Sequence, residues 1–259
     1  LGELPKGLET IIEVGDTLER PLTVGPYDLI IGNPPYGRLK LSPALRTKFS
    51  RSLYGHANLY GLFLDFAVHV ARPGSGVIAF VTPTGFLCGE YFKNLRSVLG
   101  AQAPLLLLDF VAEREGVFDD VLQETLLAVF RKGARGSAQV SFVAVESRLV
   151  TPSSGGTFEL PTPHESPWIL ARSTSTKGLA KTLRALPTRL ADWGYRVSTG
   201  PLVWNRFKDR LRNEPSKKTV PLLWAESVSP DGTFEFRAAR RNHAPYFVVA
   251  EGEDHLLVR

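Results

Sequence analysis

Short apolar runs alternate with helical patterns over the first 150 residues. Apolar runs of strand length occur at residues 9–14, 27–31, 76–81, 104–111, 125–131 and 140–145. Residues 58–70 and 91–99 instead carry apolar side chains three and four positions apart, which is the spacing of one helix face. This alternation predicts an α/β fold in which helices connect the strands of a mostly parallel sheet.

The last two of these runs predict a hairpin. Residues 125–131 and 140–145 are joined through the turn-forming stretch Lys132-Gly-Ala-Arg-Gly136. A short connection of this kind favours antiparallel pairing. We therefore expect an antiparallel C-terminal hairpin at the end of the sheet.

The pattern changes after residue 150. Residues 151–175 are rich in Pro, Ser, Thr and Gly, which predicts a linker. Beyond it come a helical pattern at 178–190 and strand-like runs at 220–224, 234–237 and 246–249. We expect three parts: a domain at 1–150, a linker at 151–175 and part of a second domain at 176–259.

Charge is distributed unevenly between the two ends of the chain. Residues 1–171 hold 15 Lys and Arg against 17 Asp and Glu, whereas residues 172–259 hold 16 against 9. A basic segment can bind a polyanion by displacing counterions from its phosphates. The alternative is an ordinary solvated basic surface.

Composition limits the remaining classes. No run approaches the roughly 18 apolar residues of a membrane span, and no secretory leader is visible. The single cysteine, Cys88, cannot form an internal disulfide, which favours a reducing cytoplasm and a small core residue. The five histidines show no metal-like spacing with carboxylates, so we expect no metal.

The most informative residues are Asn33-Pro34-Pro35-Tyr36, directly after the apolar run at 27–31. In parallel sheets, ligands bind at the carboxyl ends of the strands. The Asn33 side-chain oxygen and the Pro34 carbonyl can accept both N–H bonds of a planar amine. Such acceptors draw the nitrogen towards tetrahedral geometry and free its lone pair, so the motif fits methylation of an amino group.

The other motif residues suit the same chemistry. Pro34 and Pro35 fix two successive φ angles, which stiffens the turn that holds the acceptors. Tyr36 offers an aromatic face for a base, worth about 1–3 kcal/mol. A base in a duplex must be flipped out to reach it. The alternative is a strand-ending turn with a surface tyrosine, which the flanking strand and Gly37 disfavour.

At this point the sequence resembles the gamma-class DNA adenine-N6 methyltransferases of restriction–modification systems. The resemblance rests on Tyr27-Asp-Leu-Ile-Ile-Gly-Asn-Pro-Pro-Tyr-Gly37 and covers roughly residues 9–147. Further blocks lie at residues 56–64, 76–83 and 116–118. It implies a Rossmann-like methyltransferase sheet, S-adenosylmethionine as the methyl donor and double-stranded DNA as the substrate.

The resemblance also implies roles for single residues. Asp16, Asn33, Pro35 and Phe63 are expected to contact the cofactor, and Phe118 is expected to form an aromatic sandwich with Tyr36 around the flipped base. Asp16 could equally cap a solvated turn. Phe63 and Phe118 could equally be core residues.

One expected part of the family pattern is missing. The glycine-rich cofactor loop should precede Asp16, and Gly74-Ser-Gly76 is no substitute because it precedes a strand. We therefore expect a fragment that lacks the N-terminal cofactor loop and the end of the recognition domain. A missing segment or a partner chain would supply the loop, and the fragment alone could be inactive.

The C-terminal part resembles the start of a target-recognition domain. Its candidate DNA-binding residues are the cations Arg206, Lys208, Arg210, Arg212, Arg240 and Arg241. Each could also be merely solvated.

Three alternative functions remain open on the sequence alone. The same motif serves release-factor glutamine methyltransferases and ribosomal RNA methyltransferases. The long extension after residue 145 disfavours the former. A non-catalytic DNA-recognition module is the third possibility.

Overall fold

A six-stranded sheet with the strand order β1-β4-β6-β5-β7-β8 organises the first part of the chain. The computed structural model describes residues 12–111, 124–146, 149–196, 202–236, 244–250 and 252. It divides into a first unit, Leu1–Pro187, and a second unit, Thr188–Arg259. The strands of the sheet are β1 (Leu29–Gly32), β4 (Val77–Pro83), β5 (Leu105–Val111), β6 (Thr125–Arg131), β7 (Ser137–Glu146) and β8 (Leu149–Glu159).

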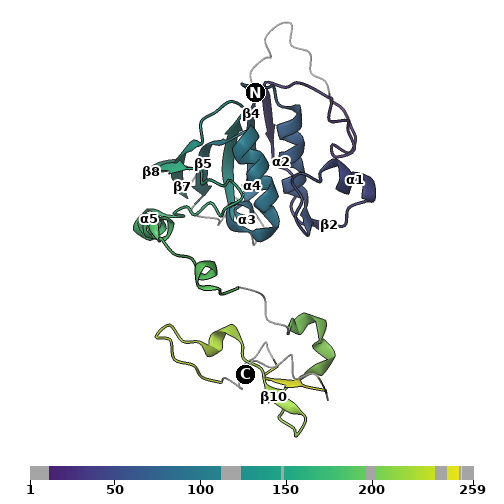
Figure 1. Ribbon diagram of the computed structural model, residues 1–259, viewed down its shortest axis with the longest axis vertical. Helices are drawn as coiled ribbons and strands as arrows, with labels where there is room; N and C mark the ends of the chain where they lie inside the picture. The colour runs from purple at the N-terminus through teal and green to yellow at the C-terminus, as the bar shows by residue number, and fades with distance from the viewer. Residues whose placement is uncertain are drawn as a thin grey trace. The chain divides into compact units, whose positions relative to one another are not determined.

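The strand directions confirm the predicted α/β class. β1 pairs parallel with β4, and β5 pairs parallel with β7, whereas β6 and β8 pair antiparallel with their neighbours. Four of the six strands therefore share one direction. Helices lie between β1 and β4 and between β4 and β5 along the chain, as in a Rossmann-like sheet (Figure 1).

The helices of the first unit follow the predicted apolar stripes. α2 (Leu59–Val70) and α4 (Lys93–Gln102) match the patterns at 58–70 and 91–99, and they pack against each other on the sheet. The remaining short elements are β2 (Arg38–Leu39), α1 (Pro43–Lys48), β3 (Ala57–Asn58), α3 (Gly85–Cys88), η1 (Glu90–Phe92), η2 (Thr174–Thr176) and α5 (Lys177–Ala185).

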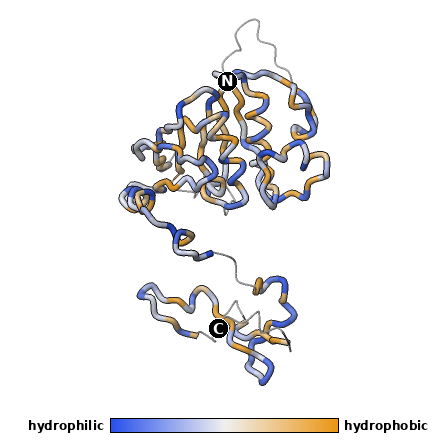
Figure 2. The backbone as a smooth tube through the Cα atoms, in the orientation of Figure 1, coloured by the Kyte–Doolittle hydropathy of each residue, from blue (hydrophilic) through white to orange (hydrophobic). Residues whose placement is uncertain are grey.

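Two apolar clusters hold the first unit together. The larger joins the strands to α2, α3 and α4, and the smaller joins α2 to α1 and to residues 18–24. Figure 2 shows hydrophobic residues along the strands and on the covering helices. Because α2 contributes to both clusters, its position relative to the sheet is set from two sides.

The predicted hairpin has different partners from those expected. β5 lies between β6 and β7, so residues 125–131 and 140–145 do not pair. β7 instead forms the antiparallel hairpin with β8 at the end of the sheet. The sequence favours residues 125–131 as the partner of 140–145 because both runs are apolar. The actual partner, β8, is rich in Thr, Pro, Ser and Gly, a composition that predicts a linker.

The predicted linker at 151–175 is wrong for the same reason. Residues 151–159 belong to β8, an edge strand, where Pro152 needs no ladder partner on its open side. Beyond β8, Trp168 is fully buried against the rings of Phe86 and Phe158. The first unit consequently extends through α5 to Pro187 instead of ending at residue 150.

The apolar run at 9–14 does not form a complete strand. Its described part, residues 12–14, lies outside regular structure, and Ile12 and Val14 are exposed. Residues 9–11 lie outside the described part of the chain. Asp16 therefore follows an extended exposed segment and not the strand that the sequence predicted.

The second unit is built around a small sheet of order β10-β11-β9. Its elements are η3 (Leu190–Trp193), η4 (Trp204–Arg206), η5 (Lys208–Arg210), β9 (Leu211–Arg212), β10 (Thr219–Pro221), η6 (Ala225–Ser227) and β11 (Tyr246–Val248). The runs at 220–224 and 246–249 thus become β10 and β11. Phe234 of the run at 234–237 makes only an isolated bridge with Val228.

Candidate active site

The Asn-Pro-Pro-Tyr motif begins one residue after β1 ends at Gly32. Asn33 and Pro35 are exposed, Pro34 is buried and Tyr36 is half-buried. Gly37 follows with a φ of 113°, a conformation that side chains rarely adopt, so a glycine is needed where the chain leaves the motif. The motif therefore sits at the carboxyl end of a sheet strand, as the sequence predicted.

Tyr36 is folded back onto the motif. Its hydroxyl donates to Asn33 Oδ1 at 3.0 Å and lies 3.4 Å from the Val81 carbonyl oxygen at the end of β4. Its ring packs edge-on against Tyr60, with ring centroids 6.2 Å apart. Burial raises the pKa of Tyr36, so the hydroxyl stays protonated and able to donate. In this arrangement, the Tyr36 hydroxyl is hydrogen-bonded to Asn33 Oδ1, the atom expected to accept from the substrate amine.

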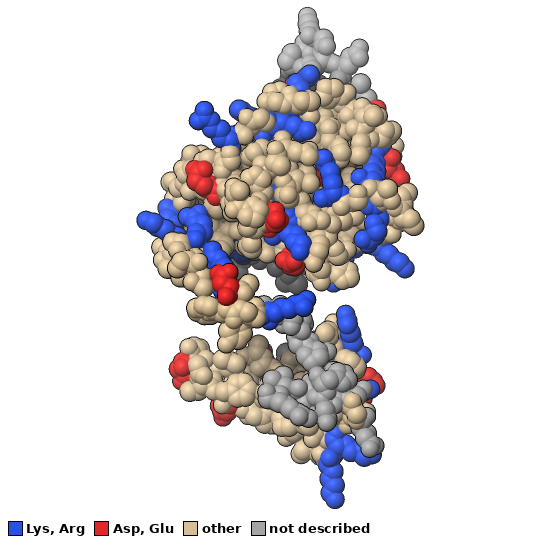
Figure 3. Space-filling view, viewed as in Figure 1, with Lys and Arg blue, Asp and Glu red and all other residues tan. Residues whose placement is uncertain are grey.

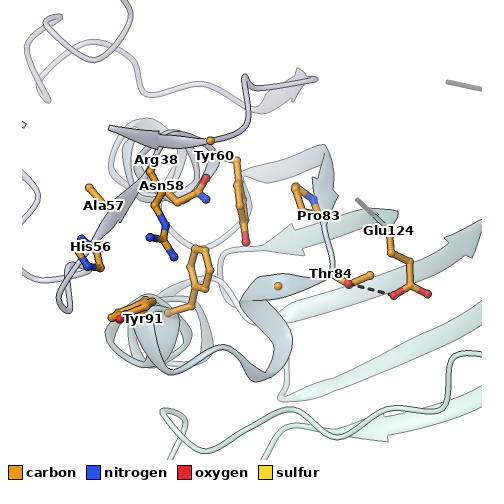
Figure 4. A pocket seen from close by; sticks show the side chains of 12 residues that line it. Arg38, His56, Ala57, Asn58, Tyr60, Pro83, Thr84, Tyr91 and Glu124 are labelled. Atoms are coloured by element: carbon orange, nitrogen blue, oxygen red, sulfur yellow. Dashed lines mark hydrogen bonds between the residues drawn. The ribbon is translucent and has the colours of Figure 1, made fainter. Parts of the chain in front are cut away.

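A cavity of about 450 Å³ opens beside the motif (Figure 4). Segments far apart in the sequence form it, namely the β2–β3 strand pair, the start of α2, the end of β4, η1 and Glu124. Its lining residues are Gly37, Arg38, His56, Ala57, Asn58, Tyr60, Pro83, Thr84, Gly85, Tyr91, Phe92 and Glu124. A cleft of this size at the carboxyl ends of sheet strands is where an α/β protein binds its ligand.

The polar groups of the cavity divide into paired and unpaired groups. Thr84 Oγ1 donates to Glu124 Oε2 at 3.2 Å, and Arg172 forms an ion pair with the same carboxylate. Asn58 Oδ1 is buried and has no hydrogen-bond partner among the described residues. Burial also raises the pKa of Tyr60, so this ring lines the cavity as a neutral phenol.

A buried ion pair positions the side of the cavity that β2 and β3 form. Asp65 on α2 is fully buried and accepts from Arg51 Nε at 2.7 Å and from Ser52 Oγ at 2.6 Å. Arg51 and Ser52 belong to the segment that leads from α1 into β3. Because a buried carboxylate needs its partners, this pairing holds that segment against α2.

A buried arginine positions the opposite side. Arg96 on α4 donates to the carbonyl oxygens of Phe86, Gly89, Glu165 and Ser166 at 2.7 to 3.1 Å. Burial lowers the pKa of Arg96. The side chain thus ties α3 and its following turn to the segment that carries Trp168.

The expected cofactor residues lie at different depths. Asp16 is exposed, and its Oδ1 accepts from the Leu18 N–H at 2.8 Å, which is the capped-turn alternative. Phe63 is half-buried and packs against both apolar clusters, as does Ile30 of β1. Pro35 is exposed beside Asn33. Phe118 lies outside the described residues.

The expected DNA-binding residues of the second unit lie near aromatic rings or the backbone. Lys208 lies 5.9 Å from the centre of the Trp204 ring, and Arg210 lies 5.4 Å from that of Phe207. Arg212 donates to the carbonyl oxygens of Asp209 and Leu211. Arg206 is exposed at the end of η4, and Arg240 and Arg241 lie outside the described residues.

Basic side chains are not confined to the second unit. Figure 3 shows Lys and Arg scattered over the visible face of the first unit as well. The four cations of residues 172–187 belong to the first unit, where Arg172 pairs with Glu124 and Lys177 donates to the Ser154 carbonyl oxygen. Part of the basic excess after residue 171 therefore lies outside the second unit.

Sequence reasoning missed four polar residues of the cavity, namely Arg38, Asn58, Thr84 and Glu124. Asn58 lies within the block at 56–64, but only the structure shows that its Oδ1 atom is buried without a hydrogen-bond partner among the described residues. Glu124 comes from a segment more than 80 residues beyond the motif. Its place in the cavity follows from β6 lying next to β4.

The described residues contain neither a metal-binding cluster nor a membrane-spanning helix. No group of three or more His, Cys, Asp and Glu side chains there could hold a metal ion. No helix in the same ranges has the length and apolar character needed to cross a membrane.

Comparison with known proteins identifies the class of protein that this fold and motif resemble. A family model described as Eco57I restriction-modification methylase matches residues 9–118. This match confirms the predicted resemblance to restriction–modification DNA methyltransferases.

Individual relatives agree with the class. The Type II methyltransferase M.BsuBI of Bacillus subtilis is 29% identical over 197 residues, covering 74% of this chain and 39% of that protein. M.PstI of Providencia stuartii is 28% identical over 243 residues, covering 90% and 47%. The chain thus spans less than half the length of either relative.

Among solved structures, one similar chain is the type IIG restriction endonuclease BpuSI. The alignment includes 93% of this chain and 33% of the BpuSI chain, with 17% sequence identity and a TM-score of 0.46.

Proposed function

We propose that the chain carries the catalytic part of a restriction–modification DNA methyltransferase that methylates the exocyclic N6 amine of adenine. The observation that carries the proposal is the Asn-Pro-Pro-Tyr motif at the carboxyl end of β1, beside a cavity built from five further segments. The family match to residues 9–118 supports it, because that range contains the whole motif.

The motif residues orient and activate the amine. Asn33 Oδ1 and the Pro34 carbonyl oxygen each accept a hydrogen bond from one of the amine's two N–H groups. This geometry directs the nitrogen lone pair out of the plane of the adenine ring. Pro34 is buried and both prolines have fixed φ angles, so the acceptors lose little freedom when the base arrives. The Tyr36 hydroxyl must leave Asn33 Oδ1 for the amine to take its place. The tyrosine ring is then available to stack on the base.

No general base is needed for the proton. Once the nitrogen carries the methyl group it becomes a strong acid, and one of its protons passes through the Asn33 or Pro34 hydrogen bond to water. The motif acceptors therefore serve both steps, orientation and proton release. The motif therefore needs neither a histidine nor a carboxylate as a base.

S-adenosylmethionine is the methyl donor, supplying an electrophilic methyl group on a positively charged sulfur. The described residues that fit it are Pro35 and Phe63, which offer apolar surface, and Asp16, whose exposed carboxylate can accept from an adenine amino group. Asn33, which is exposed next to Pro34 and Pro35, would be a fourth contact to the cofactor. Phe118 would complete the stack on the substrate base with Tyr36.

DNA is the substrate, and the second unit belongs to the domain that recognises its target sequence. The adenine is flipped out of the duplex, because an amine paired within the helix cannot reach acceptors in a protein turn. Arg206, Lys208, Arg210, Arg212, Arg240 and Arg241 would contact phosphates or base edges. Lys208 is exposed beside the Trp204 ring, and Arg210 is half-buried beside the Phe207 ring.

The proposal is tested by identifying the methylated product. Duplex DNA is incubated with the full-length protein and radiolabelled S-adenosylmethionine, then digested to nucleosides and separated by chromatography. We expect the label in N6-methyladenine. Label in methylcytosine, or transfer to a release-factor peptide or ribosomal RNA but not to DNA, would contradict the proposal.

A further inference from the structure

The cavity beside the motif is not formed by the acceptors of the motif. Gly37 lines it, but Asn33 and Pro34 do not. The Tyr36 ring packs against Tyr60, which stands at the cavity wall. An amine held by Asn33 and Pro34 would therefore lie outside the cavity. The cavity has room for a different part of the substrate.

One wall of the cavity is aromatic. Tyr60 and Phe92 lie with ring centroids 5.1 Å apart, and Tyr91 meets His56 edge-on at 5.2 Å. These rings come from α2, η1 and the segment before β3, so they are fixed by separate elements. Aromatic surfaces of this kind stack nucleic-acid bases irrespective of their sequence.

Asn58 supplies an acceptor that the free protein leaves unused. Its Oδ1 atom is buried and has no hydrogen-bond partner among the described residues, although Asn58 lines the cavity. Buried polar atoms in folded proteins nearly always have a partner. A ligand N–H would satisfy this oxygen, and every unpaired base carries at least one N–H donor.

Arg38 supplies the charge that a phosphate requires. It is exposed at the start of β2 and forms no ion pair with the described residues. Figure 4 shows the Arg38 guanidinium beside Asn58, with Glu124 on the other side of the cavity. The Glu124 carboxylate is paired with Arg172 and Thr84, so its charge is balanced.

We propose that this cavity binds a second nucleotide of the substrate strand, next to the adenine that is methylated. Its base lies against the aromatic wall and donates an N–H to Asn58 Oδ1, and its phosphate contacts Arg38. The inference rests on the proposed DNA substrate and adds a subsite to it. Such a subsite would hold the strand in its distorted path while the target base is flipped out.

The test compares the DNA affinity of two variants of the full chain. Affinity is measured by fluorescence anisotropy with a fluorescently labelled, single-stranded oligodeoxyadenylate. Asn58→Leu keeps the side-chain size but removes the acceptor, and we expect affinity to fall about tenfold. Because the variant removes an unpaired buried oxygen, its unfolding temperature should stay the same or rise. Arg38→Gln should weaken binding and lower the slope of log affinity against log salt by about 0.7. Arg46→Gln, an exposed arginine in α1 outside the cavity, is the matched control and should change neither quantity.

The outcomes separate the subsite from the proposed function. If the unaltered chain binds and both variants bind equally well, the subsite is wrong and the methylation proposal stands. If the unaltered chain binds no DNA strand, the subsite is overturned and the proposed substrate is contradicted with it. A lower unfolding temperature for Asn58→Leu would show that the fold itself uses this oxygen, which also overturns its role as a ligand acceptor.

Discussion

The two units of the chain differ most in how much of each is buried. The first unit has two apolar clusters, a six-stranded sheet and fully buried polar anchors such as Asp65 and Arg96. In the second unit, Phe247 is the one large apolar side chain that is fully buried among the described residues. Trp193, Tyr195 and Phe234 are each more than 60% exposed there.

This contrast matches the two tasks of the proposed enzyme. Methyl transfer needs acceptors held within a fraction of an ångström, and a well-packed core provides that rigidity. Binding a polyanion needs accessible cations and aromatic surface, which a thin unit offers at little cost in packing. We infer that the chemistry depends on the first unit, and that the exposed cations of the second unit add DNA contacts to those of the cavity in the first.

The largest stability effect is expected from the buried ion pair of the first unit. Asp65→Ala leaves the Arg51 guanidinium without its carboxylate and Ser52 without its acceptor, and should lower the free energy of unfolding by about 3–5 kcal/mol. Hydrogen exchange should show faster opening of α2 with no change in the second unit. The exposed Asp28–Arg72 pair is the control, and Asp28→Ala should have a far smaller effect. A loss below about 1 kcal/mol for Asp65→Ala would contradict the anchoring role.

The second unit should depend on a single side chain. Phe247→Ala removes a ring that packs edge-on against Phe207 and should destabilise the β9–β11 sheet by about 3 kcal/mol, at the low end of the range because a small unit can collapse. Limited proteolysis should then cut the second unit while the first remains intact. Equal cleavage of both units by the protease would contradict the prediction that Phe247 stabilises the second unit alone.

Tyr36→Phe tests whether the tyrosine hydroxyl competes with the substrate amine. The change removes the hydrogen bond to Asn33 Oδ1 but keeps the ring, and should strengthen binding of adenine-containing DNA about fivefold, equivalent to about 1 kcal/mol. Titration of labelled DNA into both proteins measures this directly. Weaker binding by the variant would mean that the hydroxyl assists the base instead of competing with it.

The smallest effect should be a pH dependence in the first unit. Burial lowers the pKa of His69, with Arg51 adding to the effect and Asp65 opposing it. A base whose pKa is lower in the folded state takes up a proton more readily when unfolded. The stability that its neutral form confers is thus fully present above about pH 6.5 and is lost as the pH falls below that value. His69→Gln should flatten the decline in unfolding temperature between about pH 7 and pH 5, and an unchanged decline would assign it to other groups.

Much of the first unit could be predicted because its elements have strong local patterns. The apolar stripe of α2 and the apolar runs of β1 and β4 identified those elements within a few residues, although Leu29 and Ile31 of β1 are exposed. The motif could be found because its function depends on four consecutive residues. For such features, the sequence pattern and the structure describe the same local geometry.

The rest depended on contacts between distant segments. β8 is polar because it lies at an exposed edge, so its composition resembles a linker even though its backbone pairs with β7 along its length. The insertion of β5 between β6 and β7 is likewise a matter of topology. Thr84 and Glu124 meet at one cavity because β6 lies next to β4, and Asn58 joins them from the separate β2–β3 sheet.

The central claim is that Asn33 activates the target amine. Its most direct test is the single-turnover rate of methyl transfer to duplex DNA by the full-length protein carrying Asn33→Ala, measured together with DNA affinity. We predict a rate at least about a hundredfold lower and a DNA affinity lowered by no more than about fivefold, because one of two preorganised acceptors is lost while the other DNA contacts are untouched. A rate within a few-fold of the unaltered protein would contradict the account.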